Sequence, residues 1–315
     1  MNPSLTHSIK SMARELGFSH VGVARVKQLE AEAERLALWL TRGYHASMEW
    51  MVRNFQNRIY PQELLPGAKS IVSVGMNYYC DAPQPNGTST ARVSRYAWGM
   101  DYHDIVKVRL ERLLQFICNA APGTRGRTCV DTGPVMEKVW AQRAGVGWIG
   151  KHSNIITRDL GSWVFLGEII LDIELAYDDS AVDRCGTCTA CIKACPTRAI
   201  VEPYVVDSNR CISYLTIEHR GNIPEKMVDQ LGGWIFGCDI CQDVCPWNSK
   251  FSRPATAQEF YPLSDHATPD VGAWSRMTPT EFGHKFQKSP IRRTKHTGLM
   301  RNLALARRTH QPTQQ

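Results

Sequence analysis

The sequence predicts an α+β protein in which a mixed α/β domain is followed by a ferredoxin-like domain that binds two four-iron clusters. Apolar residues recur with helical and strand spacing along the first half of the 315-residue chain. Eight of the eleven cysteines lie between residues 185 and 245. Hydrophobic residues make up 43% of the chain, which is enough for a core, and no apolar run approaches the length that spans a membrane.

The N-terminal half divides into alternating helices and strands. Residues 4–17 form the first expected helix, because apolar side chains recur on one side of it before Gly17 ends it. The further expected helices cover residues 28–42, 104–120 and 134–144, the last with a proline at its start. The expected strands are His20–Ala24, Ser70–Met76, Thr128–Val130, Ser153–Thr157 and Ser162–Asp172. A loop rich in Pro, Asn, Gly, Ser and Thr covers residues 81–90, and we expect it to be exposed.

Two cysteine runs end in Cys-Pro, as in ferredoxins that hold two clusters. The first is Cys185-x2-Cys188-x2-Cys191-x3-Cys195, and the second, Cys238-x2-Cys241-x3-Cys245, is one cysteine short, a place that Cys211 can fill. A Cys-x2-Cys-x2-Cys turn curls around one cubane while the distal cysteine reaches the other. We therefore predict that cluster one is bound by Cys185, Cys188, Cys191 and Cys245, and cluster two by Cys211, Cys238, Cys241 and Cys195.

Zinc ribbons and disulfides explain these cysteines less well. Zinc sites usually pair two separated knuckles and need neither three closely spaced cysteines nor a following proline. The N-terminus is amphipathic and interrupted by charge, so we expect no signal peptide and a cytoplasmic protein, in which disulfides are rare. Cys80, Cys118 and Cys129 lack partners at ligand spacing, and we expect them to be small buried residues.

The net charge of +7 is concentrated at the C-terminal end. From Arg276 onward there are nine Lys and Arg residues against one acid, Glu281, which is +8 in forty residues. A localised basic segment is typical of proteins that bind a polyanion such as nucleic acid. A solvated, partly disordered terminus would show the same composition, and the sequence leaves both readings open.

The N-terminal half holds two candidate chemical motifs. Gly145-x-Gly147-x-x-Gly150 matches the dinucleotide fingerprint, but it follows a helix and leads into a strand, so we interpret it as a glycine-rich helix stop. Asp131 closes a strand immediately before an expected helix. Its carboxylate could cap that helix, or it could act as a general acid if burial raised its pKa, and the residues alone leave both roles open.

Six segments resemble the epoxyqueuosine reductase family. The resemblance extends from about Leu5 to Trp247, and its strongest segments are 94–103 (SRYAWGMDYH), 130–137 (VDTGPVME), 145–153 (GVGWIGKHS), 161–168 (GSWVFLGE), 211–218 (CISYLTIE) and 237–242 (GCDICQ). Members of this family pair two four-iron clusters with a cobalamin, as reductive dehalogenases do. The resemblance implies reduction of epoxyqueuosine to queuosine at the tRNA wobble position, the last step of queuosine synthesis.

The family resemblance also implies roles for individual residues. Asp131 would protonate the epoxide oxygen as it leaves carbon. The cobalamin contacts implied are Arg53, Ser94, Asp131, Ser153 and Ser213, although each could equally be a cap, a turn residue or a surface group. The candidates for contact with RNA phosphates are Arg220, Arg292, Arg293 and Lys295. Trp247 is a candidate for stacking on an extruded base.

His103 lies in a segment that is similar to a cobalt-binding element of other corrinoid proteins. That element is Asp-x-His-x-x-Gly, and here Val106 stands in place of its glycine. We therefore predict that His103 is a structural or supporting residue and that cobalt receives no ligand from the protein.

We expect the chain to consist of three regions, and three hypotheses describe its function. We expect a cobalamin-binding catalytic domain (1–175), a ferredoxin-type domain (176–255) and a basic C-terminal segment that contacts tRNA (256–315). About seventy residues follow the last cluster cysteine, and we therefore expect none of the helical repeats that some relatives append. We expect a monomer that binds the anticodon loop of tRNA and receives electrons from a ferredoxin or flavodoxin. The alternatives are a dehalogenase-like reductase of a small molecule and an electron-transfer partner protein without a substrate of its own.

Overall fold

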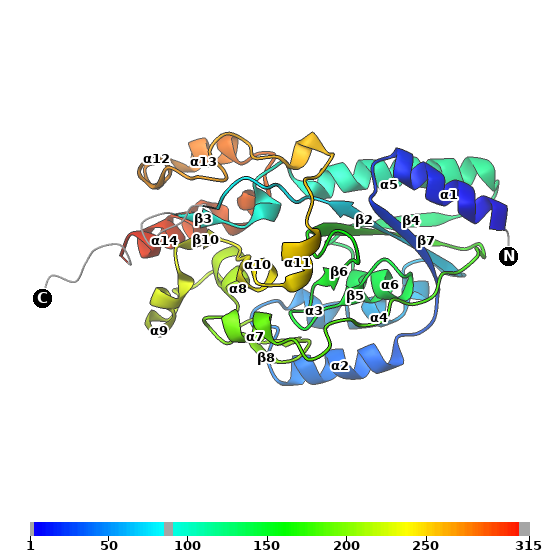
Figure 1. Ribbon diagram of the computed structural model, residues 1–315, viewed down its shortest axis with the longest axis horizontal. Helices are drawn as coiled ribbons and strands as arrows, with labels where there is room; N and C mark the ends of the chain where they lie inside the picture. The colour runs from blue at the N-terminus through cyan, green and yellow to red at the C-terminus, as the bar shows by residue number, and fades with distance from the viewer. Residues whose placement is uncertain (1–2, 85–90, 309–315) are drawn as a thin grey trace, which may run out of the picture.

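The computed structural model describes residues 3–84 and 91–308, and its centre is a four-stranded antiparallel sheet (Figure 1). The strand order is β1-β2-β7-β4. The strands are β1 (His20–Arg25), β2 (Ser70–Asn77), β7 (Val164–Leu171) and β4 (Gly126–Cys129). All but the last residue of β2 are buried, because helices cover both faces of the sheet.

Each face of the sheet carries its own hydrophobic core. On one face, α1 (Pro3–Glu15) and α5 (Tyr102–Ala120) pack against alternate residues of β2 such as Val72 and Val74. On the other face, α2 (Glu30–Thr41), α4 (Phe55–Ile59) and α6 (Glu137–Arg143) surround residues such as Ile71 and Ile170. The three layers are visible at the right of Figure 1.

The cluster region and the C-terminal region consist of short elements. Along the chain, the segments that connect the strands of the sheet contain α3 (Trp50–Arg53), β3 (Arg92–Val93), β5 (Trp148–Ile149) and β6 (Ile155–Ile156). The cysteine-rich region contains α7 (Ala190–Ala194), β8 (Ile200–Glu202), β9 (Val205–Val206), α8 (Ile212–Ile217), α9 (Glu225–Val228), β10 (Trp234–Phe236), α10 (Ile240–Asp243) and α11 (Pro246–Phe251). The last region contains α12 (Val271–Ser275), α13 (Pro279–Lys285), the 3-10 helix η5 (Pro290–Thr294) and α14 (Lys295–Arg308).

The basic C-terminal segment is folded as far as the structure describes it, and it shares a core with earlier parts of the chain. Strand β3 pairs with β10 in parallel, and α14 packs against β10. Trp98, Phe236, Trp274, Phe286 and Leu299 are completely or almost completely buried in one cluster. Packing therefore crosses the predicted domain boundaries at residues 175 and 255, and residues 256–308 are not a solvated tail. Residues 85–90 of the predicted loop and 309–315 of the basic segment lie outside the described residues.

The structure confirms the main predicted elements and corrects one of them. The helix expected from Pro134 begins at Glu137, so the proline is not at its start, and its N-cap residue Met136 makes no capping hydrogen bond. Residues 131–136 instead form an irregular loop. Gly145 follows this helix with a φ of 75°, as expected for a glycine helix stop. Among the described residues, no helix is both long and apolar enough to cross a membrane.

Candidate active site and cluster centres

The four cysteines predicted to bind cluster one line a single cavity of about 120 Å³. Cys191 lies on α7, Cys245 immediately precedes α11, and Cys185 and Cys188 lie on the loop before α7. Burial, followed by repulsion from the other three thiols, raises the pKa of Cys191. Thiols crowded in this way lose their protons readily only to a positively charged metal centre, as in an iron–sulfur cluster.

The four cysteines predicted to bind cluster two lie in the wall of a second cavity of about 430 Å³. They are Cys195, Cys211, Cys238 and Cys241. The last cysteine of each run therefore lies with the other run, as the ferredoxin spacing predicts. Burial raises the pKa of Cys211, while hydrogen bonds from the backbone of Tyr214 and Ser213 and from the Ser213 side chain oppose that rise.

The hydrogen bonding of a buried histidine is further evidence that these two cavities hold iron–sulfur clusters. His152 is 5% exposed and lines both cavities. Its Nδ1 accepts a hydrogen bond from the Asn154 N–H at 3.2 Å, so its Nε2 carries the hydrogen, and Nε2 has no partner among the described residues. Burial lowers the pKa of His152 to about 4, so the ring is neutral. A buried donor without an acceptor is costly, and a cluster sulfur in either cavity would supply one.

Aromatic side chains form one wall of the larger cavity. The rings of Tyr102 and Phe165 stack with centroids 4.2 Å apart and planes within 3°, and Tyr78 stacks on Phe165 at 4.3 Å. A broad aromatic wall of this kind suits a flat, largely apolar cofactor. The cavity also adjoins the cysteines of cluster two, so a corrin bound there would lie beside its electron source.

Four of the five predicted cofactor contacts line this cavity. Ser94, Asp131, Ser153 and Ser213 are among its lining residues, whereas Arg53 is exposed on α3 and is not. The Ser94 hydroxyl donates to Asp239, between two ligands of cluster two, and the Ser153 hydroxyl donates to the Tyr204 carbonyl at 2.9 Å. These two serines therefore fix the cavity wall through hydrogen bonds within the protein.

Asp131 lies in this cavity on a strained backbone. Its φ is 45°, in the left-handed region that few non-glycine residues adopt, and its side chain is 55% exposed. Such strain is commonly found at functional sites. The carboxylate does not cap α6, which begins six residues later, so the capping role left open by the sequence is excluded.

His103 holds the Asp131 carboxylate. Its Nε2 lies 2.9 Å from Asp131 Oδ2, and its Nδ1 lies 2.6 Å from Asp101 Oδ1. Asp101 in turn caps α5 by accepting the His103 N–H at 3.1 Å. The prediction that His103 is a supporting residue agrees with this arrangement, because both ring nitrogens are occupied by carboxylates.

The proton of this group resides on His103. Burial opposes protonation, but hydrogen bonds to Asp101 and Asp131 outweigh it and raise the pKa of His103 to about 9. The partial desolvation of Asp131 in the cavity favours its protonation, but the His103 hydrogen bond and charge outweigh it and lower the pKa of Asp131. We expected Asp131 to act as a general acid only if burial raised its pKa. Asp131 alone does not meet this condition, because its histidine partner stabilises the carboxylate.

Two glutamates near Asp131, the half-buried Glu137 and the fully buried Glu168, were not predicted from the sequence. The backbone N–H of Asp131 donates to Glu137, and burial and the charge of Asp131 raise the pKa of Glu137 to about 8. Burial, together with Glu137, raises the pKa of Glu168 well above its usual value, and its Oε1 accepts from Ser73 at 3.3 Å. Glu168 lies in the middle of the apolar strand Val164–Leu171, and an acid at that position was a signal that could have been noticed.

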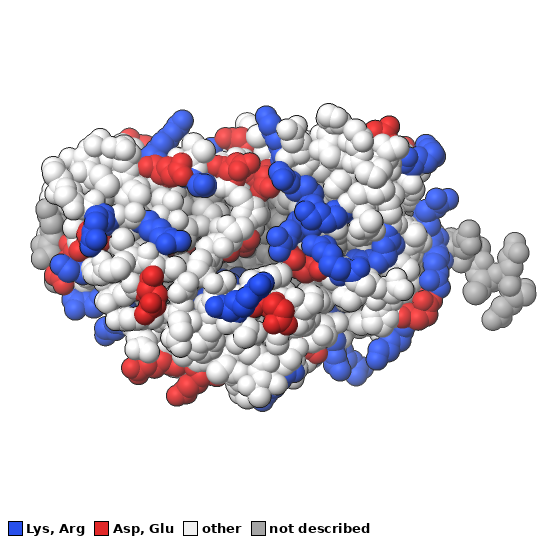
Figure 2. All heavy atoms as spheres, turned by 180° about the vertical axis from the view of Figure 1, so that it is seen from behind, with Lys and Arg blue, Asp and Glu red and all other residues white. Residues whose placement is uncertain are grey.

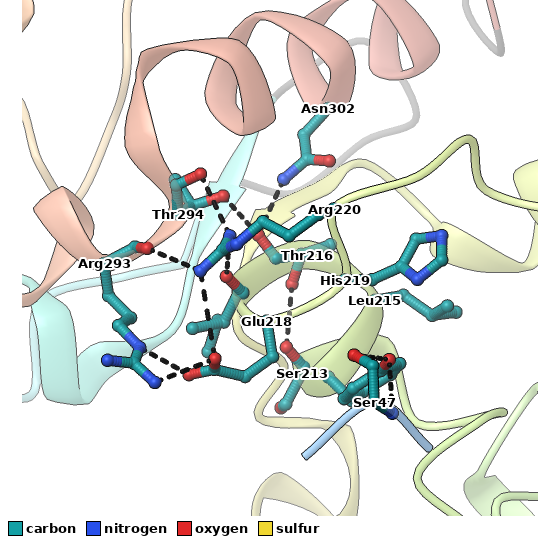
Figure 3. Close-up of polar contacts among 12 residues, drawn as sticks. Ser47, Ser213, Leu215, Thr216, Glu218, His219, Arg220, Arg293, Thr294 and Asn302 are labelled. Carbon is teal, nitrogen blue, oxygen red and sulfur yellow. Dashed lines mark hydrogen bonds and ion pairs between the residues drawn. The ribbon is translucent and has the colours of Figure 1, made fainter. Parts of the chain in front are cut away.

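Of the predicted RNA-binding residues, Arg220 and Arg293 lie where α8 meets η5 (Figure 3). Arg220 donates to the carbonyls of Ile217, Thr294 and Arg293, at 2.8, 3.2 and 3.0 Å, and so braces these segments. Arg293 forms a two-pronged ion pair with Glu218 at 2.8 and 3.0 Å. Arg292 and Lys295 are exposed.

This basic group lies close to the acids of the cavity. The hydrogen bond with Glu218 raises the pKa of Arg293, and the charge of Asp131 adds to this. Burial favours protonation of Asp101, but the hydrogen bond with His103 outweighs it and lowers the pKa, and the charge of Arg292 adds to this. Figure 2 shows Lys and Arg side chains gathered beside a hollow in this part of the surface. Trp247 instead packs against Trp148, with ring centroids 4.7 Å apart, and lines the cluster-one cavity. It is therefore not an exposed platform for a base.

Comparison with known proteins now places this arrangement in a family. Residues 58–132 match the family described as "Epoxyqueuosine reductase QueG, DUF1730", and residues 184–248 match "4Fe-4S double cluster binding domain". The epoxyqueuosine reductase of Leadbetterella byssophila is 48% identical over 299 residues, which cover 95% of this chain and 97% of the relative. The chain belongs to the epoxyqueuosine reductase family. The protein of the same name from Cellulophaga algicola is 45% identical and covers 96% of this chain and 99% of its own.

Solved structures of epoxyqueuosine reductases have the same fold. One, with a tRNA-Tyr epoxyqueuosine-modified stem loop, has a TM-score of 0.88 at 31% identity and covers 96% of this chain and 80% of its own. Another, from Bacillus subtilis, has its catalytic aspartate loop swung out of the active site, with a TM-score of 0.86 at 29% identity and the same coverage. The double-cluster match agrees with two 4Fe–4S clusters, the cofactors for which the cysteine cavities are suited.

Proposed function

We propose that this protein reduces epoxyqueuosine to queuosine at the wobble position of tRNA, using cobalamin and two 4Fe–4S clusters. The observation that carries the proposal is the larger cavity, whose wall contains both Asp131 and the cysteines of cluster two. A reductive opening of an epoxide needs electrons and a proton at one place, and this cavity brings the two sources together. Cobalamin, when bound there, supplies the cobalt that passes electrons to the substrate carbon.

The protein's own contribution to the chemistry is a held proton. Two electrons and two protons convert the epoxide to an alkene and water. His103 stores one proton at neutral pH, and Asp131 lies between it and the cavity. As negative charge develops on the epoxide oxygen, the stored proton moves from His103 Nε2 through the Asp131 carboxylate to that oxygen, and solvent supplies the second proton. Asp101 keeps the histidine ring in place throughout.

The basic residues beside the cavity serve RNA binding in this proposal. Arg292, Arg293 and Lys295 attract the phosphates that flank the modified nucleotide of the anticodon loop. Arg220 supports them mainly as a brace, because its guanidinium already donates to three carbonyls. We further propose a cytoplasmic monomer that receives electrons from a ferredoxin or flavodoxin.

The nucleosides of tRNA from a strain that lacks this protein test the function. The proposal predicts that epoxyqueuosine accumulates and that the wild-type gene restores queuosine. Normal queuosine in the deletion strain would refute it. Restoration by the Asp131→Asn variant would refute the role of Asp131 while leaving the overall reaction in place.

A further inference from the structure

The two cluster cavities differ in their relation to the protein surface. The cysteines of cluster two line the wall of the larger cavity, whereas those of cluster one line the smaller cavity. The two cavities adjoin, because His152 lines both. Of the eight ligand cysteines, all within the described chain, Cys188 alone is exposed. Electrons that come from outside therefore reach cluster one first.

Two exposed apolar side chains lie beside the cluster-one cysteine loop. Val182 is 72% exposed and Tyr204 is 42% exposed. Val182 lies three residues before the ligand Cys185, and Tyr204 is joined to the same loop through Asp183. The Tyr204 hydroxyl donates to Asp183 at 2.5 Å, and Asp183 also accepts the N–H of the ligand Cys185 at 2.7 Å.

The edge formed by this loop carries positive charge without carboxylate partners. Arg184 and Lys193 are exposed, and neither forms an ion pair within residues 3–84 and 91–308. Between residues 182 and 204 there are two acids. Asp183 accepts the hydrogen bonds from Tyr204 and Cys185, and Glu202 forms an ion pair with Arg42. Behind the loop, the Lys151 ammonium donates to the carbonyls of Gly186 and Cys188, at 2.6 and 2.9 Å.

We propose that an acidic electron-carrier protein of the flavodoxin type docks on this edge. We call it the input surface, and it consists of Val182, Arg184, Cys188, Lys193 and Tyr204. A thiolate-bound cluster is itself negative, so the surrounding cations offset its charge and allow an acidic partner to approach. The apolar pair supplies a small contact that excludes water, as in short-lived electron-transfer complexes. In each encounter, the reduced flavin of the carrier loses one electron and cluster one gains it.

The inference rests on the proposed ligands of cluster one and is independent of the RNA substrate. It is therefore tested by the reduction of the clusters, without tRNA. A failure here would leave the epoxide reduction untouched, and a failure of that function would leave the input surface standing.

The test compares two double variants of the enzyme with both clusters bound. Val182→Glu with Lys193→Glu changes the input surface by three charges and avoids the residues that line the cluster cavities. Val108→Glu with Arg14→Glu makes the same change on α5 and α1, on the far side of the sheet (Figure 1). Stopped-flow bleaching of the cluster absorption reports reduction by reduced flavodoxin and by the small methyl viologen radical.

The proposal predicts that the input-surface variant is reduced by flavodoxin at least about tenfold more slowly at low salt. Its reduction by methyl viologen and both reactions of the control stay within twofold of the wild type, and added salt narrows the difference. An unchanged flavodoxin rate, or an equal loss in the control, would overturn the proposal. Carbodiimide cross-linking of wild-type enzyme to flavodoxin is a second measurement, independent of the variants. It should join Lys193 to a flavodoxin carboxylate, and cross-links confined to other lysines would overturn the proposal as well.

Discussion

The replacement of His103 by glutamine tests whether the proton for epoxide opening is stored on the histidine. Glutamine can still donate a hydrogen bond to Asp131, but it cannot carry a titratable proton. The cobalamin cavity and both clusters should therefore remain intact. The expected change is confined to the supply of the proton, and a cofactor-binding measurement on the variant serves as the control.

The contribution of protonated His103 to the free energy of unfolding follows from its pKa. Contacts with two carboxylates raise it from 6.5 to about 9, and each pKa unit corresponds to about 1.4 kcal/mol, which gives about 3 kcal/mol. Because the Asp131 side chain is 55% exposed, solvent screening reduces this to about 1–2 kcal/mol. This stabilisation is complete below pH 6.5 and is lost as the pH rises through about 9, because both the folded and the unfolded states then lose the proton.

Single-turnover reduction, started with enzyme reduced beforehand, provides the assay. Wild-type activity should fall on the alkaline side with an apparent pKa near 9. The His103→Gln variant should lose that alkaline limb and react about 100-fold more slowly at neutral pH, a typical loss for general acid catalysis. The same alkaline limb in the variant, or a rate within threefold of wild type, would refute the reasoning.

Three further predictions concern other parts of the site. Asp131→Asn should abolish turnover while cobalamin remains bound, as measured by its absorption in the purified protein; loss of both would mark Asp131 as a binding residue. His152→Leu removes a buried donor from the cluster cavities and should make at least one cluster harder to reduce in an EPR redox titration, whereas His152→Asn should restore much of the wild-type potential; identical titrations for all three proteins would contradict it. Arg220→Met should lower the free energy of unfolding by about 1–3 kcal/mol, because three hydrogen bonds to carbonyls are lost. Lys295→Met should weaken tRNA binding in a filter-binding assay and leave the free energy of unfolding unchanged. The opposite pattern would reverse the roles of the two residues.

The parts of the structure that the sequence predicted are those with a local signal. Cysteine spacing predicted which cysteines line each cavity, and apolar periodicity located the long strands of the sheet and the long helices that cover it. Helix α6 was misplaced by three residues because Pro134 suggested a helix start, whereas the chain first forms the loop that carries Asp131. A proline is compatible with the first turn of a helix, but its presence does not determine the residue at which the helix begins.

The parts that could not be predicted depend on contacts between distant segments. The pairing of β3 with β10, and the core that joins residues 91–98 to α14, have no signature in either segment alone. The partnership of His103 with Asp131 crosses 28 positions of the chain, and it determines which of the two residues holds the proton. The family resemblance indicated Asp131, and only the spatial arrangement showed that its acidity depends on a neighbour.

The most direct test of the central claim is the reaction itself. Purified enzyme loaded with cobalamin and both clusters is mixed with tRNA that contains epoxyqueuosine and with a low-potential reductant, and the nucleosides are then analysed by mass spectrometry. We predict stoichiometric conversion to queuosine by the wild type and none by Asp131→Asn. Unchanged epoxyqueuosine with the fully loaded wild-type enzyme would contradict the proposed function.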